Sequence, residues 1–399
     1  MRLRPLIAID FSSLDHLSPF TGHYRYVVNL VRGLAELRPE ASFILLGSRP
    51  APVDELSSIF EDPAWHYRQA VRQHGRGSYY RDHLGLAWTA LRERVDLLHV
   101  LQSPVPVLAP CPVVVTIYDL MAELFPEYAR AAASRPYRID RWAVRHRARR
   151  AIAISATTAA DLNRLWGIGR GKIDVVPLGS SFVGWAINES ARRESRARFG
   201  ELCADATVLS PYNLEPRKNL AALLKAVNIV RSQHHKLRLL LFGRAAVTAE
   251  RERQFEKILA ELGLGDAVHR LGPLSDTDLV WLYGNTTMFV FPSLYEGFGL
   301  PVLEAMTAGA CVIARNASAM AGIVGKAGAL METGNPAALA TMIAALLEAP
   351  ERRAQLATEA RKRSRTFTVE RMARLTNTSY SIALDRPEAE RHGSRMELQ

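Results

Sequence analysis

Short apolar runs alternate with longer stretches of helical periodicity along most of this chain, and this alternation constrains the fold more than any other feature. In the first half the apolar runs fall at 5–10, 42–47, 97–100, 112–119, 151–155 and 172–178. Helical patterns lie between them, as at 23–37 and 137–151. Such runs are typical of strands buried on both faces, and a βαβα order predicts a parallel sheet covered by helices on both sides.

A polar stretch at 180–206 interrupts the alternation and contains no strand-like run, so we place a domain junction there. A second series follows, with strands expected at 207–212, 237–243, 268–272, 287–293 and 310–315. Helices are expected at 219–233, 250–263, 276–285, 301–309 and 335–349. A chain of 399 residues is too long for one core, which favours two domains.

The sequence therefore predicts an α/β protein of two doubly wound, Rossmann-like domains that face each other across a cleft. We place the first domain at 1–182 and the second at 183–370. A helix at 371–385 is expected to pack back on the first domain, and the tail at 386–399 is expected to be disordered.

Composition excludes several classes of protein. No apolar run reaches the roughly 18 residues that span a bilayer, and the apolar run that ends at Asp10 is too short for a signal peptide. We therefore expect a cytosolic protein. Cys111, Cys203 and Cys311 lie far apart without metal-binding spacing, so we expect free thiols.

The formal net charge is +11, and much of it lies in 135–150, which holds seven arginines and one acid. One interpretation is a solvated helix face. Another is a patch for anionic lipid headgroups, on the inner face of a membrane, or for a phosphorylated acceptor. Nucleic acid is the third, and no nucleic-acid motif appears elsewhere to favour it.

The segment FPSLYEGFGLPVLEAMTAGA, at 291–310, predicts a strand, a glycine-containing loop and a helix. Glu296 lies in the loop, and we expect Glu304 in the first turn of the helix. A helix N-terminus offers backbone N–H groups to an anion, and a carboxylate accepts hydrogen bonds from vicinal sugar hydroxyls. The alternative is that Glu304 only complements the helix dipole and Glu296 is solvated.

Arg217 and Lys218 lie at the predicted start of the helix at 219–233, where cations are unfavourable. We expect an anion to compensate them, and a diphosphate would do so. The alternative is that both are simply exposed. Asp276 and Asp278 form a pattern that binds metal in other proteins, but they open a predicted helix, so we expect Ser275 or Asp276 to cap it.

On these residues the chain resembles glycosyltransferase family 4, which has the GT-B fold. The resemblance runs from about residue 5 to 385. Its strongest parts are FPSLYEGFGLPVLEAMTAG, which resembles the family's motif of Glu, seven residues and Glu, then LEPRKNL and VHRLGPLSDTDLVWLYGNTTMFVFPS. Looser matches are TGHYRY, TIYDLMAELFPE, AISATTAADL and KIDVVPLG in the first domain.

The resemblance implies a role for each matching residue. Glu304 binds the ribose of the donor, and Glu296 holds hydroxyls of the transferred sugar. The loop of Gly297, Phe298, Gly299 and Leu300 lines the sugar and the diphosphate. Arg217 and Lys218 neutralise the leaving diphosphate. Gly22 lets the first domain approach the phosphates, while Tyr118 and Asp119 lie on the catalytic side. The family retains anomeric configuration and needs neither metal nor cofactor.

Three positions depart from the family. Tyr118 stands where a histidine is usual, and a tyrosine is a poor base because its ordinary pKa is about 10. Asp119 then carries more of the role, or Tyr118 only lines the sugar pocket. Tyr212 replaces a common glycine and is interpreted as a cover over a substrate pocket. Gly322 stands where the family often has glutamate. Either this segment serves only for packing, or the change alters donor preference or activity.

The leading hypothesis is a metal-independent enzyme that moves a hexose, with mannose from GDP as a first guess and UDP sugars next, to a lipid-linked or growing saccharide. The second domain would bind the donor and the first the acceptor. Bacterial surface polysaccharide synthesis is the setting that the resemblance implies. A catalytically impaired relative that binds nucleotide or glycan is the alternative. An epimerase or phosphorylase on the same fold is a third possibility. LEPRKNL and the paired glutamates disfavour an epimerase, and a phosphorylase would be expected to have a lysine-bound pyridoxal cofactor and a much longer chain.

Overall fold

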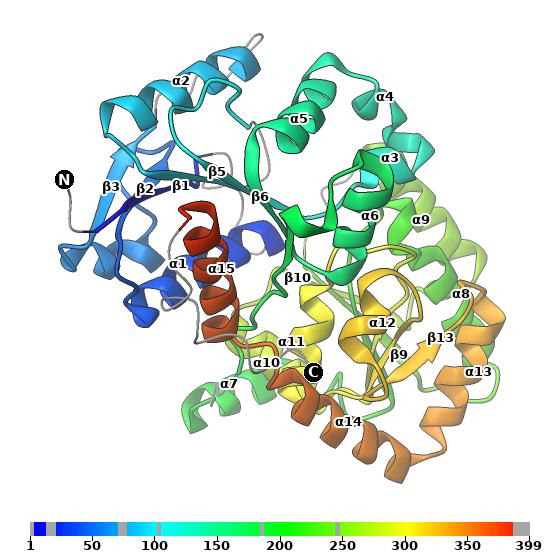
Figure 1. The fold of residues 1–399 in the computed structure, drawn as a ribbon. Coiled ribbons are helices and arrows are strands. Elements are labelled where there is room, and N and C mark those ends of the chain that lie inside the picture. Colours follow the sequence, from blue (N-terminus) through cyan, green and yellow to red (C-terminus); the bar gives the residue numbers. More distant parts are fainter. Residues whose placement is uncertain are drawn as a thin grey trace. The chain divides into compact units, whose positions relative to one another are not determined.

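A computed structural model describes residues 4–12, 21–70, 78–101, 105–183, 187–243 and 248–385. The chain divides into two compact units (Figure 1). The first contains residues 1–179 together with 369–399, and the second contains 180–368. The prediction placed the changes of unit at 182/183 and 370/371. The predicted tail at 386–399 lies outside the described residues.

The first unit is built on a seven-stranded sheet in the order β3-β2-β1-β4-β5-β6-β7, and every pair of neighbours is parallel. The strands are β1 (Leu6–Asp10), β2 (Ser42–Gly47), β3 (Trp65–Gln69), β4 (Leu97–Leu101), β5 (Val113–Ile117), β6 (Ala148–Ala153) and β7 (Ile173–Val175). The order reverses between β1 and β4, as in doubly wound folds, and ligands of such sheets bind beyond the carboxyl ends of the strands.

Helices cover both faces of this sheet (Figure 1). They are α1 (Gly22–Leu37), α2 (Ser78–Arg92), α3 (Met121–Leu124), α4 (Ala129–Ala132), α5 (Arg135–His146), α6 (Ala156–Trp166) and α15 (Val369–Ala383), with 3-10 turns η1 (Asp54–Glu61), η2 (Pro126–Tyr128) and η3 (Arg170–Lys172). Residues of α2, α5 and α6 belong to one core cluster with the strands. On the other face, α15 returns to pack against α1. A side chain at Gly33 would lie 3.0 Å from the Cβ of Ala373.

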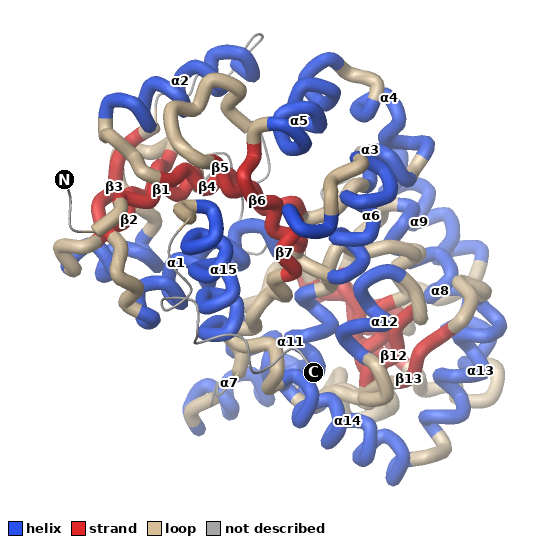
Figure 2. Tube along the Cα trace, viewed as in Figure 1, coloured by secondary structure: helices blue, strands red, loops and turns tan. Residues whose placement is uncertain are grey.

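The second unit has a six-stranded parallel sheet in the order β10-β9-β8-β11-β12-β13. Its strands are β8 (Thr207–Pro211), β9 (Arg238–Phe242), β10 (Val268–Gly272), β11 (Met288–Phe291), β12 (Val312–Arg315) and β13 (Ala329–Met331). Its helices are α7 (Glu189–Phe199), α8 (Leu220–Arg231), α9 (Ala249–Glu261), α10 (Asp276–Asn285), α11 (Leu300–Ala308), α12 (Ser318–Val324), α13 (Pro336–Leu347) and α14 (Pro350–Ser364), with the 3-10 turn η4 (Pro216–Lys218). Both units therefore have the expected Rossmann-like α/β architecture (Figure 2).

One predicted helix was too long. The pattern at 137–151 was interpreted as continuous helix, but α5 ends at His146 and β6 begins at Ala148. The arginine run concealed the boundary, because a polar strand end has no apolar signature. Arg150 lies in β6 and forms an ion pair with Asp174 of the neighbouring strand β7 (Nε to Oδ2, 2.8 Å). The charge run thus belongs to two elements.

Several of the described elements were not predicted, among them two strands and the helix α7. The strand β3 lies at the edge of its sheet, and its sequence WHYRQ is mostly polar. The strand β13 has three residues and is also an edge. The helix α7 occupies part of the polar junction at 180–206, and its Asn188 cap accepts a hydrogen bond from the backbone of Ala191 (2.8 Å). Edge strands and polar helices lack the buried runs on which the prediction depended.

Candidate active site

The loop between β11 and α11 has the strand–loop–helix order that the sequence predicts. Gly299 is the N-cap of α11 with a φ of 109°, a left-handed backbone that favours glycine. A Cβ there would also meet the end of the Met320 side chain. Pro301 follows in the first turn, and Gly309 ends the helix with a φ of 83°. The loop geometry therefore depends on glycine at both ends of the helix.

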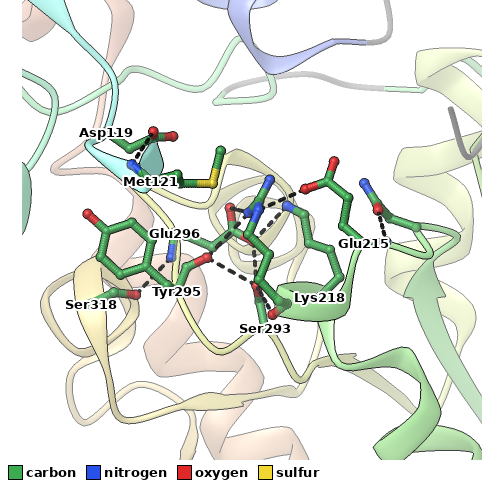
Figure 3. Close-up of polar contacts among 10 residues, drawn as sticks. Asp119, Met121, Glu215, Lys218, Ser293, Tyr295, Glu296 and Ser318 are labelled. Carbon is green, nitrogen blue, oxygen red and sulfur yellow. Dashed lines mark hydrogen bonds and ion pairs between the residues drawn. The ribbon is translucent and has the colours of Figure 1, made fainter. Parts of the chain in front are cut away.

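Glu296 lies in this loop and is 9% exposed. Its Oε1 accepts hydrogen bonds from the Ser293 hydroxyl (2.6 Å) and from Lys218 Nζ (2.7 Å). Its Oε2 lies 3.2 Å from the guanidinium of Arg217. The backbone N–H of Glu296 donates to the hydroxyl of Ser318 in α12 (3.1 Å), as Figure 3 shows. The interpretation of Glu296 as a solvated carboxylate is therefore wrong.

Arg217 and Lys218 lie in η4, just before α8, and neither is simply exposed. Their side chains are 10% and 19% exposed. Arg217 also pairs with Glu215 (Nε to Oε2, 2.8 Å). The backbone joins the two loops as well, because the N–H of Leu294 donates to the carbonyl of Arg217 (2.7 Å). The expected compensating anion is thus already present within the chain, as Glu296 and Glu215.

The electrostatics of this group, which we call the Glu296 cluster (Glu215, Arg217, Lys218, Ser293 and Glu296), follow from its contacts. Burial alone would raise the pKa of Glu296, but the charges of Lys218 and Arg217 and the hydrogen bonds from Lys218 and Ser293 hold this pKa below its ordinary value. Glu296 is therefore ionised at neutral pH. The two carboxylates balance the two cations, so the cluster is formally neutral.

Glu304 lies in the second turn of α11, since the helix begins at Leu300, and not in the first turn as predicted. It is 6% exposed. The helix dipole acts mainly within the first turn, so the dipole alone is a poor reason for a carboxylate at this position. Phe298 and Leu300 of the predicted donor loop are buried, and Phe298 packs edge-on against Phe367 (ring centroids 6.1 Å apart).

Gly22, Tyr118 and Asp119 belong to the first unit. Tyr118 and Asp119 directly follow β5, at the carboxyl end of the sheet, where ligands of doubly wound folds bind. Asp119 is half-buried, and its Oδ1 accepts a hydrogen bond from the backbone of Met121 (3.1 Å; Figure 3). Gly22 is the first residue of α1, and in the described structure no atom lies within 4 Å of a Cβ placed there.

Tyr118 is buried, and two aromatic rings pack against it. Its ring lies edge-on to His23 (4.3 Å between centroids) and to Tyr26 (5.5 Å). No described residue forms a hydrogen bond with its hydroxyl. Burial raises the pKa of Tyr118 well above its ordinary value, so its hydroxyl stays protonated and cannot act as a base.

Behind Tyr118 runs a chain of buried neutral groups, the hydroxyl–imidazole chain. The Tyr26 hydroxyl lies 3.1 Å from Thr116 Oγ1, which lies 2.8 Å from His99 Nε2. His99 Nδ1 in turn lies 2.7 Å from the hydroxyl of Tyr380 in α15. Burial lowers the pKa of His99 to about 3, so its imidazole is neutral at physiological pH. All four side chains are fully buried.

Sequence reasoning missed Ser293 and His23, both of which contact predicted site residues. Ser293 is the last residue of the strand expected at 287–293, and it lies two residues beyond β11, at the carboxyl end of the sheet where ligands of parallel sheets commonly bind. His23 stands beside Gly22 in the predicted glycine loop. The position of each residue in the chain is the signal that could have identified it, whereas the site was predicted mainly from charged residues and glycines.

The remaining predicted positions have identifiable contacts. The Ser275 hydroxyl caps α10 by accepting from the backbone of Asp278 (3.1 Å), which confirms the capping prediction. Asp278 also pairs with Arg198 (2.6 Å). Among the described residues no cluster of His, Cys, Asp or Glu has the arrangement of a metal site. The three cysteines are free thiols, of which Cys311 is buried.

Tyr212 and Gly322 lie outside the Glu296 cluster. The Tyr212 hydroxyl donates to Glu252 of α9 (2.7 Å), and its ring packs against Phe255. Gly322 lies in α12, and in the described structure a Cβ there would meet no atom within 4 Å. Space for a larger side chain is thus available at Gly322.

Two family models divide this chain between them. The model described as Glycosyltransferase Family 4 matches residues 20–180, and the model described as Glycosyl transferases group 1 matches residues 191–363. The first match covers residues 20–179 of the first unit and extends one residue beyond it, and the second match lies within the second unit. The fold and these matches define a glycosyltransferase with two Rossmann-like domains. More particularly, the chain belongs to glycosyltransferase family 4.

Individual relatives and structures agree with this assignment. The MMP alpha-(1->4)-mannosyltransferase of Mycolicibacterium hassiacum is 30% identical over 59% of this chain and 54% of that protein. The serotype-specific mannosyltransferase WbdA of Escherichia coli is 29% identical over 54% of this chain and 27% of its own length. The matches therefore span about half of these relatives or less. The structure of Anabaena HepE in complex with UDP and glucose has the same fold, with a TM-score of 0.74 and 19% identity over 95% of this chain and all of that chain.

Proposed function

We propose that this protein transfers a hexose from a nucleotide diphosphate sugar to a saccharide acceptor, with retention of configuration and without a metal ion. The observation that carries the proposal is the Glu296 cluster at the carboxyl end of the second sheet, where one ionised carboxylate is held by a lysine and an arginine. Cleavage of a sugar–phosphate bond builds negative charge on the diphosphate, and fixed cations stabilise that charge.

The geometry supports a specific division of roles. Lys218 has three N–H donors and gives one to Glu296, so it can keep this contact and still donate to a phosphate oxygen. Arg217, held by both Glu215 and Glu296, is oriented before any donor arrives. Glu296 would accept hydrogen bonds from the transferred sugar. The two cations would take the part that a divalent ion takes in metal-dependent transferases.

The donor loop supplies the remaining contacts. The backbone of Gly297, Phe298, Gly299 and Leu300 would face the sugar and diphosphate, because the first N–H groups of a helix lack intrahelical acceptors. Glu304 would bind the ribose, since a buried carboxylate in the second helical turn accepts paired hydroxyls. In the first unit, Gly22 would let the backbone approach phosphate, and Asp119 would contact the sugar beside Tyr118.

The identities of the donor and of the acceptor are a more specific part of the proposal. A mannose-like hexose carried by GDP is favoured because two relatives are named mannosyltransferases, and a UDP sugar is next because HepE was solved with UDP and glucose. WbdA is named serotype-specific, which supports a lipid-linked or growing saccharide acceptor in surface polysaccharide synthesis. We place this reaction in the cytoplasm, at the inner face of a membrane, because arginines cluster at 135–150.

The first test is thermal unfolding of the purified protein with UDP, GDP, ADP and TDP in parallel, without metal. A ligand that binds only the folded state stabilises it by about 2.7 kcal/mol at a hundred times its Kd. We expect one nucleotide to raise Tm and expect Glu304→Ala to abolish that rise. Glu250→Ala, at an exposed position of α9, is the matched control.

Transfer itself is the second test. With the nucleotide sugar chosen by the melting experiment, Glu296→Ala should mainly slow sugar release, whereas Glu304→Ala should mainly weaken donor binding. If both variants turn over like the wild type, the assignment of the two glutamates is wrong. Nucleotide binding without any sugar release would instead favour the alternative of a catalytically impaired relative, for which the inert, enclosed Tyr118 is the supporting observation.

A further inference from the structure

The outer side of α2 is apolar. Leu86 and Ala90 face inward and belong to the core cluster of the first unit. On the opposite side Leu84, Trp88 and Leu91 are 60%, 61% and 56% exposed. Spacings of four and three residues place these side chains in one stripe. A surface helix is normally polar on this side, and adjoining large apolar side chains in water indicate an interaction site.

A second helix joins α2 to form a wider surface. The imidazole of His83 in α2 lies 3.8 Å from the carboxylate of Asp140 in α5. Both helices pack into the same core cluster, so they cover the same face of the sheet (Figure 1). Trp142 of α5 is 48% exposed, and Leu108, in the loop that precedes β5, is 70% exposed. Arg147 holds this loop by donating to the carbonyl of Val107 (2.7 Å).

The outward side of α5 is strongly basic. Arg135, Arg138 and Arg145 are exposed and, with Trp142, recur at spacings of three and four residues. None of these three arginines forms an ion pair with a described carboxylate. Other arginines of the segment are engaged within the unit: Arg141 with Glu123 (3.1 Å), and Arg149 with Asp385 (2.7 Å). The charge run is therefore only partly neutralised, and the unpaired part surrounds Trp142.

We define the α2–α5 face as Leu84, Trp88, Leu91, Leu108 and Trp142, with Arg135, Arg138 and Arg145. We propose that this face docks on an anionic phospholipid bilayer. The leucines and tryptophans would enter the headgroup region, and the arginines would contact lipid phosphates. This inference rests on the proposed function in one respect, that such a bilayer carries the lipid-linked acceptor.

The chemistry of the face favours lipid over a protein partner. Tryptophan and arginine both combine an apolar body with a polar end, which suits the boundary between acyl chains and water. An apolar stripe flanked by cations is the composition of helices that lie in a membrane interface. The overall charge of +11 adds long-range attraction to an anionic surface.

Flotation of the full chain with vesicles tests the proposal. We expect binding to phosphatidylcholine vesicles that contain about a third phosphatidylglycerol, little binding to pure phosphatidylcholine, and release at about 0.5 M salt. The triple variant R135E/R138E/R145E should weaken binding by about a hundredfold or more, since each arginine near an anionic surface contributes roughly fivefold. The triple variant L84S/W88S/L91S should also weaken vesicle binding. This loss should persist at low salt, because it removes apolar contacts and not charge.

Matched controls come from elsewhere in the chain. R192E/R193E/R196E changes three exposed arginines of α7, and V175S/I229S changes two exposed apolar residues. V175S/I229S should bind vesicles like the wild type, and R192E/R193E/R196E should weaken binding far less than R135E/R138E/R145E, because it changes the overall charge equally but leaves the α2–α5 face intact. The proposal is overturned if all variants bind vesicles equally well. It is also overturned if the wild type binds equally to vesicles with and without phosphatidylglycerol. A different outcome is that the wild type binds no vesicles and is a dimer on size exclusion, while L84S/W88S/L91S is a monomer. The α2–α5 face would then contact a second copy of the chain, and the lipid proposal would be wrong.

The nucleotide melting experiment separates this inference from the proposed function. The variants of the α2–α5 face should keep the nucleotide-induced rise in Tm, because none of the changed residues belongs to the second unit. Loss of vesicle binding with this rise intact supports docking. Vesicle binding by a wild-type protein that responds to no nucleotide would leave docking standing and remove the proposed transferase function.

Discussion

The Glu296 cluster of the second unit and the hydroxyl–imidazole chain of the first are both largely buried and hydrogen-bonded, yet they use opposite chemistry. The Glu296 cluster consists mainly of ionised groups that hold each other by ion pairs of 2.7 to 3.2 Å. The hydroxyl–imidazole chain contains only neutral groups, because burial keeps His99 unprotonated.

This difference indicates how each unit would respond to a bound ligand. A buried network of charges is costly to assemble and is sensitive to the arrival of another charge, such as a diphosphate. A neutral network gives a rigid, charge-free support for the side chain in front of it, here Tyr118, whose ring packs edge-on against Tyr26 of the network. We therefore expect changes in the Glu296 cluster to affect turnover, and changes in the hydroxyl–imidazole chain to affect stability first.

The largest effect is expected at Lys218. Lys218→Ala removes a fixed cation from the proposed leaving group, and the loss of one such donor typically costs about 3–4 kcal/mol, or about 10²–10³-fold in kcat. Glu296 keeps Arg217 and Ser293 as partners, so the variant should fold. Turnover of the donor identified by melting provides the measurement. Lys225→Ala, at an exposed position of α8, should turn over normally; equal turnover by both variants would contradict the role of Lys218.

The second prediction concerns the pH dependence of stability. His99 has a folded pKa of about 3 against an ordinary 6.5, so only the unfolded chain binds its proton between these values. Its contribution to stability is complete above pH 6.5 and is lost, at up to about 1.4 kcal/mol per pH unit, as the pH falls toward 3. Denaturant unfolding from pH 6.5 to about 5 should show this slope in the wild type and a smaller one in His99→Gln.

The same experiment separates the two networks. The pKa of Glu296 is lowered from 4.5, so its contribution to stability is present above 4.5 and is lost only as the pH falls further. Glu296→Gln should therefore leave the slope above about pH 5 unchanged. Identical slopes for wild type and His99→Gln in that range would show that His99 is not held neutral by the fold.

The third prediction compares two tyrosine hydroxyls. Tyr380→Phe removes a hydroxyl that His99 contacts and should lower the free energy of unfolding by about 1–2 kcal/mol. Tyr118→Phe removes a hydroxyl with no partner among the described residues, so stability should stay equal or rise by about 1 kcal/mol. Denaturant unfolding measures both. A marked loss in Tyr118→Phe would reveal a hydrogen bond to this hydroxyl.

The smallest effect on stability is expected at two helical glycines. Gly22→Ala and Gly322→Ala each place a methyl group in open space at a backbone without positive φ, so each should raise stability by about 0.5 kcal/mol. Only Gly22→Ala should slow transfer, because Gly22 is proposed to approach the phosphates. Unchanged transfer by both variants would remove Gly22 from the site.

The sequence predicted much of the fold because its central strands are continuous apolar runs, such as 97–100 and 288–291. It did not predict β3 and β13, which lie at sheet edges and have weak apolar patterns, nor the end of α5 inside an arginine run. The candidate residues Arg217, Lys218 and Glu296 were identified by type and position. Their mutual pairing was not, because a contact between residues 78 positions apart depends on tertiary structure.

The return of α15 to the first unit has a consequence for how the protein is made. Tyr380 follows its partner His99 by 281 positions, with the whole second unit between them. During translation the second unit can complete its sheet as soon as it emerges. The first unit must hold the imidazole of His99 in its core without its hydrogen-bond partner Tyr380 until α15 has been synthesised. The first unit to be synthesised is therefore the last to finish folding.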